Sequence, residues 1–299
     1  MNRRRFLALA GGAGLAASGL ACTRWSDDTW NLQVHQVEIP LPHLPQWAEN
    51  LKIAHLSDLH IGQDVPDDFI RQALKLAQQQ APDLIVFTGD FVSYNWENLR
   101  RMRSAFKALQ AKYGVFACLG NHDSFCDREK HVCAELRQTG VQVLDNDAVC
   151  IGSNLWLAGL GDPTTQRDNL SQTMHNVPAE ACCIMLSHAP DPIDQAAKAG
   201  VDLILAGHTH GGQVNLPVIG PPLVPAKHGP KYAQGLFSHQ NTRMFVTRGI
   251  GVVPPAYRLN CSPEVAILTL KKADRQLPDG HFGIDFRPVV RKLRLLRWS

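Results

Sequence analysis

The sequence predicts an α/β fold in which helices cover buried β-sheets. Short apolar runs of strand length alternate along the chain with helix-length segments, an order typical of α/β proteins. The runs are almost continuously apolar, as strands buried on both faces are. Five of them end at a side chain that can bind a metal ion. Because ligands of such folds gather at the carboxyl ends of strands, this predicts a functional site at one edge of the sheets.

The predicted elements follow one another in a regular order. The five runs with metal-binding ends are 51–57, 84–89, 115–120, 182–187 and 203–207. Further strands are expected near 32–39, 244–247 and 265–270, and helices over 67–80, 96–112, 128–139 and 190–199. The segment 40–45 contains three prolines and predicts a link, whereas the proline- and glycine-rich segment 214–230 predicts a long loop.

The overall composition excludes some classes of function. The chain of 299 residues is 44% apolar, which is enough for a substantial core, and it carries a net charge of +3. This near balance argues against a general nucleic-acid-binding surface, so no specific nucleic-acid partner is expected. The eight cysteines are not spaced like a disulfide framework, and we expect mainly buried, unreactive thiols.

The N-terminal segment 1–22 predicts an export signal. Arg3 and Arg4 precede an uncharged stretch that runs to Ala21, and at about 16 residues this stretch is short for a membrane span, which needs roughly 20. The pattern resembles the signal of the twin-arginine route, which implies the translocase as a transient partner and export across the cytoplasmic membrane to the periplasm or cell envelope. Cleavage after Ala21, lipidation at Cys22 and retention as an anchor all stay open.

The chain divides into four predicted segments. These are the signal or anchor 1–22, an N-terminal strand and linker 23–50, the catalytic domain 51–270 and a basic C-terminal tail 271–299. The tail mixes arginine and lysine with leucine, so it can contact an anionic membrane surface, as the segment 1–22 can. A solvated terminal helix is the more ordinary outcome of such a pattern.

The ends of the apolar runs supply a set of metal ligands. Asp58 and His60 are two positions apart, and on extended backbone such residues point to the same side and can address one ion. His208 and His210 repeat this spacing, and they either share an ion or serve two neighbouring ions. The set contains oxygen and nitrogen donors without thiolate, which suits manganese, iron or zinc. Its members are Asp58, His60, Asp90, Asn121, His188, His208 and His210.

The charge of this set indicates the reaction. Two divalent ions bring four positive charges, and the carboxylates of Asp58 and Asp90 return two, so a surplus remains that attracts a phosphate anion. Two metals about 3.5–4 Å apart lower the pKa of a bound water toward about 7 and hold the phosphorus between the attacking and leaving oxygens. Direct attack by metal-bound hydroxide is therefore expected.

His55 lies in the run 51–57 at an odd number of positions from Asp58 and His60, so on a strand its side chain points to the opposite face. It is expected to be packed or hydrogen-bonded.

Taken together, these motifs resemble a known family signature. The motifs are Asp58-x-His60, Gly89-Asp90, Gly120-Asn121-His122-Asp123, His188 and Gly207-His208-Thr-His210-Gly-Gly-Gln213. They look like the signature of the calcineurin-like metallophosphoesterases over about 51–270. Thr247-Arg-Gly-Ile-Gly251 and Arg258-x-Asn260, with the twin-arginine start, narrow the resemblance to the YaeI/YkuE type of phosphodiesterase.

The resemblance implies a fold and a division of roles. The family fold is a four-layer sandwich, with two mixed sheets packed face to face and helices outside. One metal would be held by Asp58, His60, Asp90 and His210, and a second by Asp90, Asn121, His188 and His208. His122 would lie by the leaving group as a general acid or phosphate contact, with Asp123 orienting it.

The substrate is defined only as a class. A small-molecule or lipid phosphoester is expected, and Lys227, Lys231, Tyr232 and Arg258 could meet its phosphate or its substituents. Two alternatives stay open: a pyrophosphatase acting on a UDP-diacylglucosamine-like lipid precursor, and a catalytically silent phosphate-binding protein. The export signal argues against the first because that precursor is cytoplasmic, and the intact ligand set argues against the second.

The export signal can be tested directly. The twin-arginine route distinguishes arginine from lysine although both are cations. The double change Arg3→Lys, Arg4→Lys should therefore leave the protein in the cytoplasm, as measured by cell fractionation. Normal export of that variant would assign the segment to the general secretory pathway instead.

Overall fold

The computed structural model describes residues 26–125, 128–273 and 280–282. The predicted signal 1–22 and most of the basic tail therefore lie outside the described residues. Within the described ranges, no helix is both long enough and apolar enough to cross a bilayer.

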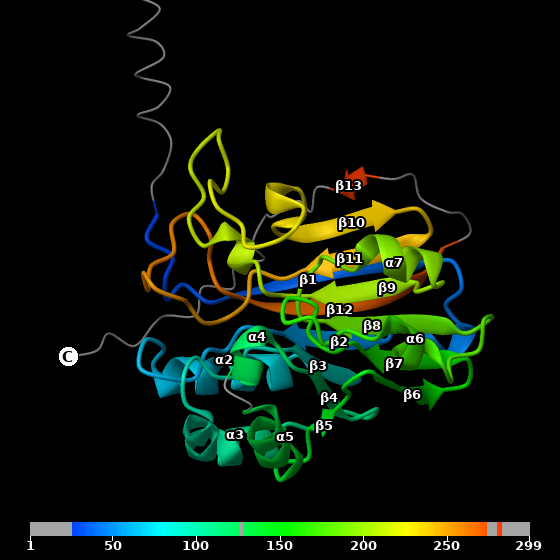
Figure 1. The fold of residues 1–299 in the computed structure, drawn as a ribbon, viewed down its shortest axis with the longest axis horizontal. Helices are drawn as coiled ribbons and strands as arrows, with labels where there is room; N and C mark the ends of the chain where they lie inside the picture. Colours follow the sequence, from blue (N-terminus) through cyan, green and yellow to red (C-terminus); the bar gives the residue numbers. More distant parts are fainter. Residues whose placement is uncertain (1–25, 126–127, 274–279, 283–299) are drawn as a thin grey trace, which may run out of the picture.

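Two mixed β-sheets form the centre of the molecule (Figure 1). The first sheet has the order β1 (Gln33–Leu41), β12 (Glu264–Lys272), β2 (Lys52–Leu56), β3 (Leu84–Thr88), β4 (Val115–Cys118) and β5 (Gln142–Val143). The second has the order β13 (Gly280–Phe282), β10 (Gly235–His239), β11 (Thr242–Val246), β9 (Leu203–Ala206), β8 (Cys182–Ser187), β7 (Leu155–Gly159) and β6 (Asp147–Gly152). Strands β2 to β5 run parallel, as do β7, β8, β9 and β11.

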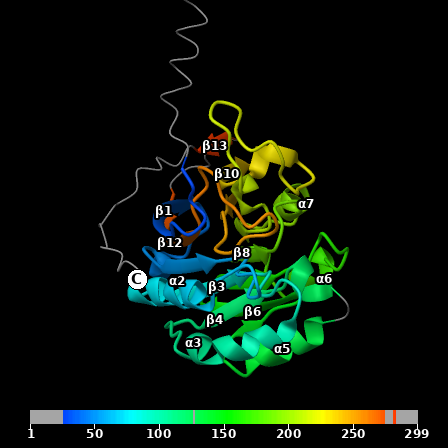
Figure 2. The same ribbon diagram turned by 90° about the vertical axis from the view of Figure 1, so that its left-hand side faces the viewer.

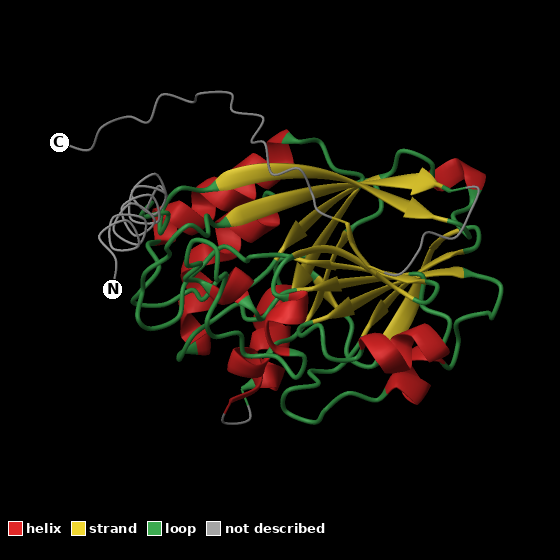
Figure 3. Ribbon diagram, turned by 90° about the horizontal axis from the view of Figure 1, so that it is seen from above, coloured by secondary structure: helices red, strands yellow, loops and turns green. Residues whose placement is uncertain are grey.

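Helices cover the outer face of each sheet (Figures 2 and 3). On the first sheet lie α2 (Asp67–Gln79), the 3₁₀ helix η2 (Trp96–Met102), α3 (Arg103–Lys107) and α5 (Glu129–Arg137). On the second lie α6 (Leu170–Met174) and α7 (Ile193–Lys198). The remaining short helices are η1 (Gln46–Ala48), α4 (Asn121–Ser124), η4 (His210–Gly212) and η5 (Gly229–Tyr232).

Alternation along the strands produces three apolar layers from two sheets. On β8, Ile184 and Leu186 point into the core between the sheets, whereas Cys183 and Met185 point outward to the core under α7. Successive strand residues face opposite sides of a sheet, so strands buried on both faces read as continuous apolar runs. The expected arrangement of two face-to-face mixed sheets between helices is confirmed.

Several predicted boundaries change in the structure. The expected helix over 96–112 is a 3₁₀ segment followed by one short α-helix, because Met102 at their junction has φ −101° and ψ −3°. The first strand continues through Pro40, which the expected link had excluded. Proline is tolerated there because β1 is an edge strand, where a missing N–H donor breaks no ladder.

The buried histidine His55 behaves as expected. Its side chain on β2 is fully buried, and Nε2 lies 2.9 Å from Oγ1 of Thr88 on the neighbouring strand. Burial lowers the pKa of His55 to about 3, so the imidazole stays neutral. The prediction of a packed, hydrogen-bonded histidine is confirmed.

Candidate metal centre

The carboxyl ends of strands from both sheets meet at one edge. Asp58 and His60 follow β2, Asp90 follows β3, and Asn121 opens α4 just after β4. From the second sheet, His188 follows β8 directly, and His208 and His210 follow β9. Three groups of three side chains have their donor atoms within 4.8 Å of one another, and a linking group of His60, Asp90 and His122 shares one member with each of the other two. The structure thus brings the predicted ligands of separate strands into one cluster.

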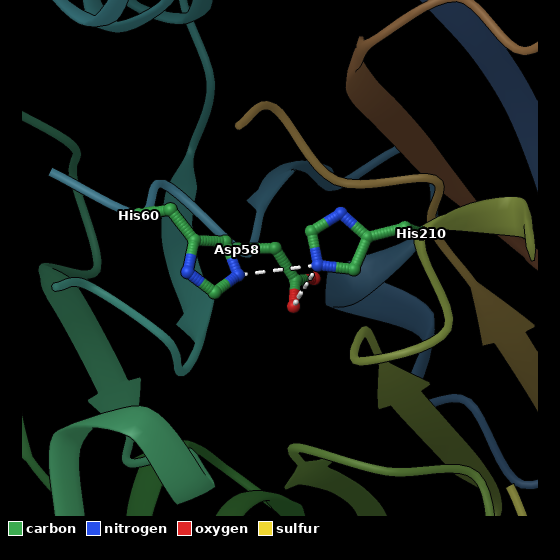
Figure 4. A group of neighbouring side chains, drawn as sticks. All are labelled: Asp58, His60 and His210. Atoms are coloured by element: carbon green, nitrogen blue, oxygen red, sulfur yellow. Dashed lines mark hydrogen bonds and ion pairs between the residues drawn. The ribbon is translucent and has the colours of Figure 1, made fainter. Parts of the chain in front are cut away.

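The first group contains Asp58, His60 and His210 (Figure 4). Nε2 of His60 lies 3.1 Å from Nε2 of His210, and the latter atom lies 3.6 Å from a carboxylate oxygen of Asp58. All three side chains are buried. Figure 4 shows the two rings on either side of the carboxylate.

The second group contains Asp90, His188 and His208. Nε2 of His188 lies 3.1 Å from Nδ1 of His208 and 3.0 Å from Oδ1 of Asn121. Asn121 therefore joins this group through its amide oxygen, which can serve as a neutral ligand.

Asp90 stands between the two groups. Its Oδ2 lies 3.6 Å from Nε2 of His60 and 3.3 Å from Nε2 of His188. Its other oxygen, Oδ1, accepts a 2.9 Å hydrogen bond from the backbone N–H of His122. One buried carboxylate thus faces nitrogens of both groups.

Left-handed backbone turns, not extended backbone, aim the ligands. The φ angles are 54° at Asp58, 47° at His60, 53° at Asp90, 68° at His208 and 51° at His210. Asp58 and His60 do reach one group, but the expected reason, two residues on one side of a strand, is wrong. Non-glycine residues adopt this region rarely, with Asp and His among the types that tolerate it best. Such strain is concentrated at functional sites.

Two glycines of the motifs leave room for the carboxylates. A Cβ at Gly120 would lie 2.3 Å from Oδ1 of Asp90, and one at Gly207 would lie 2.5 Å from Oδ2 of Asp58. Any larger residue would displace a carboxylate. Close approach therefore explains why these two positions are glycine.

Burial and mutual charge set the protonation of the cluster. Burial raises the pKa of Asp58 to about 6. Burial is the largest single influence on Asp90 and raises its pKa, but the charge and hydrogen bond of His188, with smaller effects of His60 and His122, together hold that pKa below its ordinary value. Burial is also the largest single influence on His188 and lowers its pKa, but the charge and hydrogen bond of Asp90, with a smaller effect of Asp58, together raise it to about 10.

The other imidazoles are held neutral. Burial lowers the pKa of His60 to about 3 and that of His208 to about 4, and it brings the pKa of His210 well below its ordinary value. Two pairs of imidazoles face one another at 3.1 Å, His60 with His210 and His188 with His208. Beside two carboxylates and an amide oxygen, their ring nitrogens form a donor set that fits divalent cations.

His122 and Asp123 contact different groups from those expected. The ring of His122 packs edge-on against His60 with centroids 4.8 Å apart, and its Nδ1 lies 3.1 Å from the carbonyl oxygen of Ser93. The buried carboxylate of Asp123 accepts backbone hydrogen bonds from Phe91 at 2.9 Å and Gly120 at 3.0 Å. Asp123 thus joins the turns after β3 and β4, whereas Ser93 contacts the imidazole that Asp123 was expected to orient.

Two residues expected at the substrate face inward. Arg258 is fully buried, and its guanidinium donates to the carbonyls of Gly251 at 2.7 Å and Arg248 at 2.8 Å. Its Nη2 also lies 3.3 Å from Nδ1 of His210, so it packs behind a candidate ligand. Tyr232 is only 3% exposed. Of the four cationic and aromatic candidates, only Lys227 and Lys231 are exposed.

Sequence reasoning missed the contacts made by backbone carbonyls. Ser93 contacts His122 through its carbonyl oxygen, and the carbonyl oxygen of Thr88 lies 2.7 Å from Nδ1 of His188. A carbonyl carries no signature of residue type, so only the position of Ser93, three residues after Asp90, could have suggested it.

A buried carboxylate–imidazole cluster at the common edge of two face-to-face mixed sheets defines a metal-dependent hydrolase. Residues 51–212 match the family model of the calcineurin-like phosphoesterases, and the chain belongs to this family of phosphoester hydrolases, which implies divalent metal ions.

Similarity to characterised and uncharacterised relatives extends beyond the matched domain. The chain is 31% identical to phosphodiesterase YaeI of Escherichia coli, over 90% of this chain and 99% of the relative. It is 28% identical to the uncharacterized metallophosphoesterase YkuE of Bacillus subtilis, over 92% of this chain and 99% of the relative. It is also 26% identical to the UDP-2,3-diacylglucosamine pyrophosphatase LpxG of Chlamydia muridarum, over 74% of this chain and 84% of the relative. The family resemblance seen in the motifs is confirmed.

The close approach at Gly120 predicts the effect of one added methyl group. Gly120→Ala should displace Asp90 and weaken metal binding, measured as a smaller rise in thermal midpoint on adding Mn²⁺. Gly62→Ala is the matched control, because its Cβ would meet nothing nearer than 3.5 Å. An unchanged metal-dependent rise in Gly120→Ala would contradict the packing argument.

Proposed function

We propose that the chain is a binuclear metal-dependent phosphodiesterase. The observation that carries this proposal is the position of Asp90, whose Oδ2 faces His60 at 3.6 Å and His188 at 3.3 Å. A carboxylate that faces ring nitrogens of two groups of possible ligands is the arrangement that suits two cations with a common ligand.

Each cation would have its own ligands under this proposal. Asp58, His60 and His210, with Asp90, would hold one, and Asn121, His188 and His208, with Asp90, would hold the other. When bound, the two cations would supply an activated water and positive charge for the phosphoryl oxygens. The donor set allows manganese, iron or zinc.

The chain's own residues orient this chemistry. The carbonyl of Thr88 lies 2.7 Å from Nδ1 of His188 and occupies that ring nitrogen, which leaves Nε2 facing Asp90 and His208. In the same way, the Ser93 carbonyl occupies Nδ1 of His122 and leaves Nε2 to hold a proton for the leaving oxygen. His122 is therefore our candidate general acid, and Asp123 supports the turn that carries it.

The phosphodiesterase proposal is supported by similarity to YaeI over nearly the whole chain. The similarity to LpxG supports a second candidate, a pyrophosphatase of a UDP-diacylglucosamine-like lipid. Steady-state rates with Mn²⁺ on bis-p-nitrophenyl phosphate, p-nitrophenyl phosphate and a nucleoside diphosphate-linked lipid separate the two. Preference for the diester supports our proposal, and activity on the pyrophosphate alone contradicts it. Export by the twin-arginine route belongs to the same proposal and depends on Arg3 and Arg4.

Removal of Asp90 tests the two-metal site. Asp90→Ala should lose the shared ligand, bind fewer metal ions per chain and lose diester hydrolysis, as measured by elemental analysis and initial rates. Glu180→Ala removes an exposed carboxylate two residues before β8, at the end of that strand opposite His188, and should leave both values unchanged. Full metal content with a near-normal rate in Asp90→Ala would refute the assignment.

Removal of His122 tests the general acid. Positioned acids contribute about 10² to 10⁴ in rate, and an alkoxide leaving group needs the proton more than a nitrophenolate does. His122→Ala should therefore keep its metal, lose most activity on alkyl diesters and lose distinctly less on nitrophenyl esters. Equal losses across a leaving-group series would assign His122 to phosphate positioning, and loss of metal would make it a ligand.

A further inference from the structure

An exposed apolar loop rises beside the metal centre. The side chains of Val218, Ile219 and Leu223 are 97%, 75% and 78% exposed, the highest values among the large apolar residues of the described chain. The loop, which we define as residues 216–231, is the yellow-green segment that extends away from the sheets in Figures 1 and 2. Within it the sequence has two lysines, Lys227 and Lys231, and no acidic residue.

The loop is fixed in this exposed position. Leu216 and Gly220 exchange backbone hydrogen bonds of 3.0 and 2.8 Å, which form a tight turn that carries Val218 and Ile219 at its tip. Pro221 packs on Gly212, where an added Cβ would lie 2.2 Å from it. A turn stiffened by proline thus keeps these side chains in solvent, and they are not the exposed part of a larger apolar cluster.

The base of the loop is joined to the candidate metal ligands. The loop begins six residues after His210 in the sequence, and Asn215, which precedes the loop, donates through Nδ2 to the carbonyl of Gly211 at 3.1 Å. The backbone N–H of Lys227 donates to Asp191 at 2.9 Å, close in sequence to His188. A surface that receives the tip of this loop would therefore lie next to the mouth of the metal centre.

The N-terminal segment leaves the fold at the same place. Ser26, the first described residue, exchanges two 3.0 Å hydrogen bonds with Asn260, whose Nδ2 donates to the carbonyl of Asn215 at 3.1 Å. Asn215 directly precedes the loop. In the sequence, the uncharged apolar stretch 6–21 ends five residues before Ser26.

We propose that the loop 216–231 inserts its apolar tip into the surface of a lipid bilayer, so that the metal centre faces the membrane and takes a phosphodiester carried by an amphiphile. An apolar tip followed by two lysines, in a loop without acidic residues, suits an anionic bilayer surface. In the sequence, the apolar stretch 6–21 lies just before Ser26 and is a second membrane-compatible segment. The substrate class rests on the proposed phosphodiesterase function, whereas the insertion of the loop does not.

Insertion can be measured without any activity. In the full-length chain, Ile219→Trp adds an indole at the loop tip. Its fluorescence in excess of the wild-type fluorescence is measured on vesicles of phosphatidylglycerol and phosphatidylethanolamine, with and without brominated acyl chains. We expect strong quenching by the brominated lipid. Asn241→Trp, in the exposed turn between β10 and β11, is the matched control and should not be quenched. Equal fluorescence of Ile219→Trp in both vesicles overturns the proposal, whether or not the chain binds vesicles through its N-terminal segment.

The substrate class needs a second measurement. In the triple variant V218S, I219S and L223S, hydrolysis of soluble bis-p-nitrophenyl phosphate should equal that of wild type, and hydrolysis of a phosphodiester lipid in vesicles should fall severalfold. Equal rates on the vesicle substrate for both proteins overturn the membrane inference and leave the phosphodiesterase proposal standing. A wild type that hydrolyses neither the soluble diester nor the vesicle phosphodiester with Mn²⁺ refutes the phosphodiesterase proposal, and bromine quenching of Ile219→Trp then still supports the insertion. The loop tip would instead bind a second copy of the chain if the wild type dimerises with rising concentration, the triple variant does not, and brominated lipid causes no quenching. That result overturns the proposal of bilayer insertion.

Discussion

Burial of two carboxylates in one place is the constraint on which the rest of this structure depends. Asp58 is fully buried and Asp90 is 2% exposed, and a buried unpaired charge is strongly unfavourable. Each carboxylate accordingly receives backbone N–H groups, from His208 for Asp58 and from His122 for Asp90. In the metal-free chain the remaining charge is matched by His188, whose pKa is raised to about 10 although burial lowers it. A divalent cation bound in this cluster would therefore replace the positive charge of His188 in balancing the two buried carboxylates.

Local backbone geometry follows from the same constraint. Each ligand pair must turn sharply off its strand to face the other sheet, and the left-handed φ values at Asp58, Asp90 and His208 provide that turn. Gly120 and Gly207 then allow the turns to touch the carboxylates. Left-handed strain of this kind persists only where surrounding contacts hold it, and Asp123 supplies such contacts between the turns after β3 and β4. Pairs of neighbouring turns that hold each other in position thus place the ligands, and the conformation of a single residue does not suffice.

The sequence predicted the fold and the cluster well because both depend on one regularity. A continuous apolar run that ends in Asp58, Asp90 or His188 identifies a buried strand and a ligand at its carboxyl end together. What it could not supply was information carried by the backbone or by distant partners. The inward direction of Arg258 depends on the carbonyls of Gly251 and Arg248, and no residue pattern encodes them. Strand β5, with two residues, and the partly exposed β6 lack the apolar run that identifies a strand.

The pairing of the first strand with the last long one affects how the chain can fold. Gln33 on β1 pairs with Glu264 on β12, which comes 231 positions later in the sequence (264 minus 33). Strand β12 lies between β1 and β2 in the sheet. At a ribosomal rate of roughly 5–20 residues per second, this partner appears about 12–46 s after β1. During that interval β1 and β2 both present unpaired edges, which are templates for association with other chains. Completion of the first sheet is thus a late event in synthesis, and this is the interval in which a chaperone that masks strand edges would have most effect.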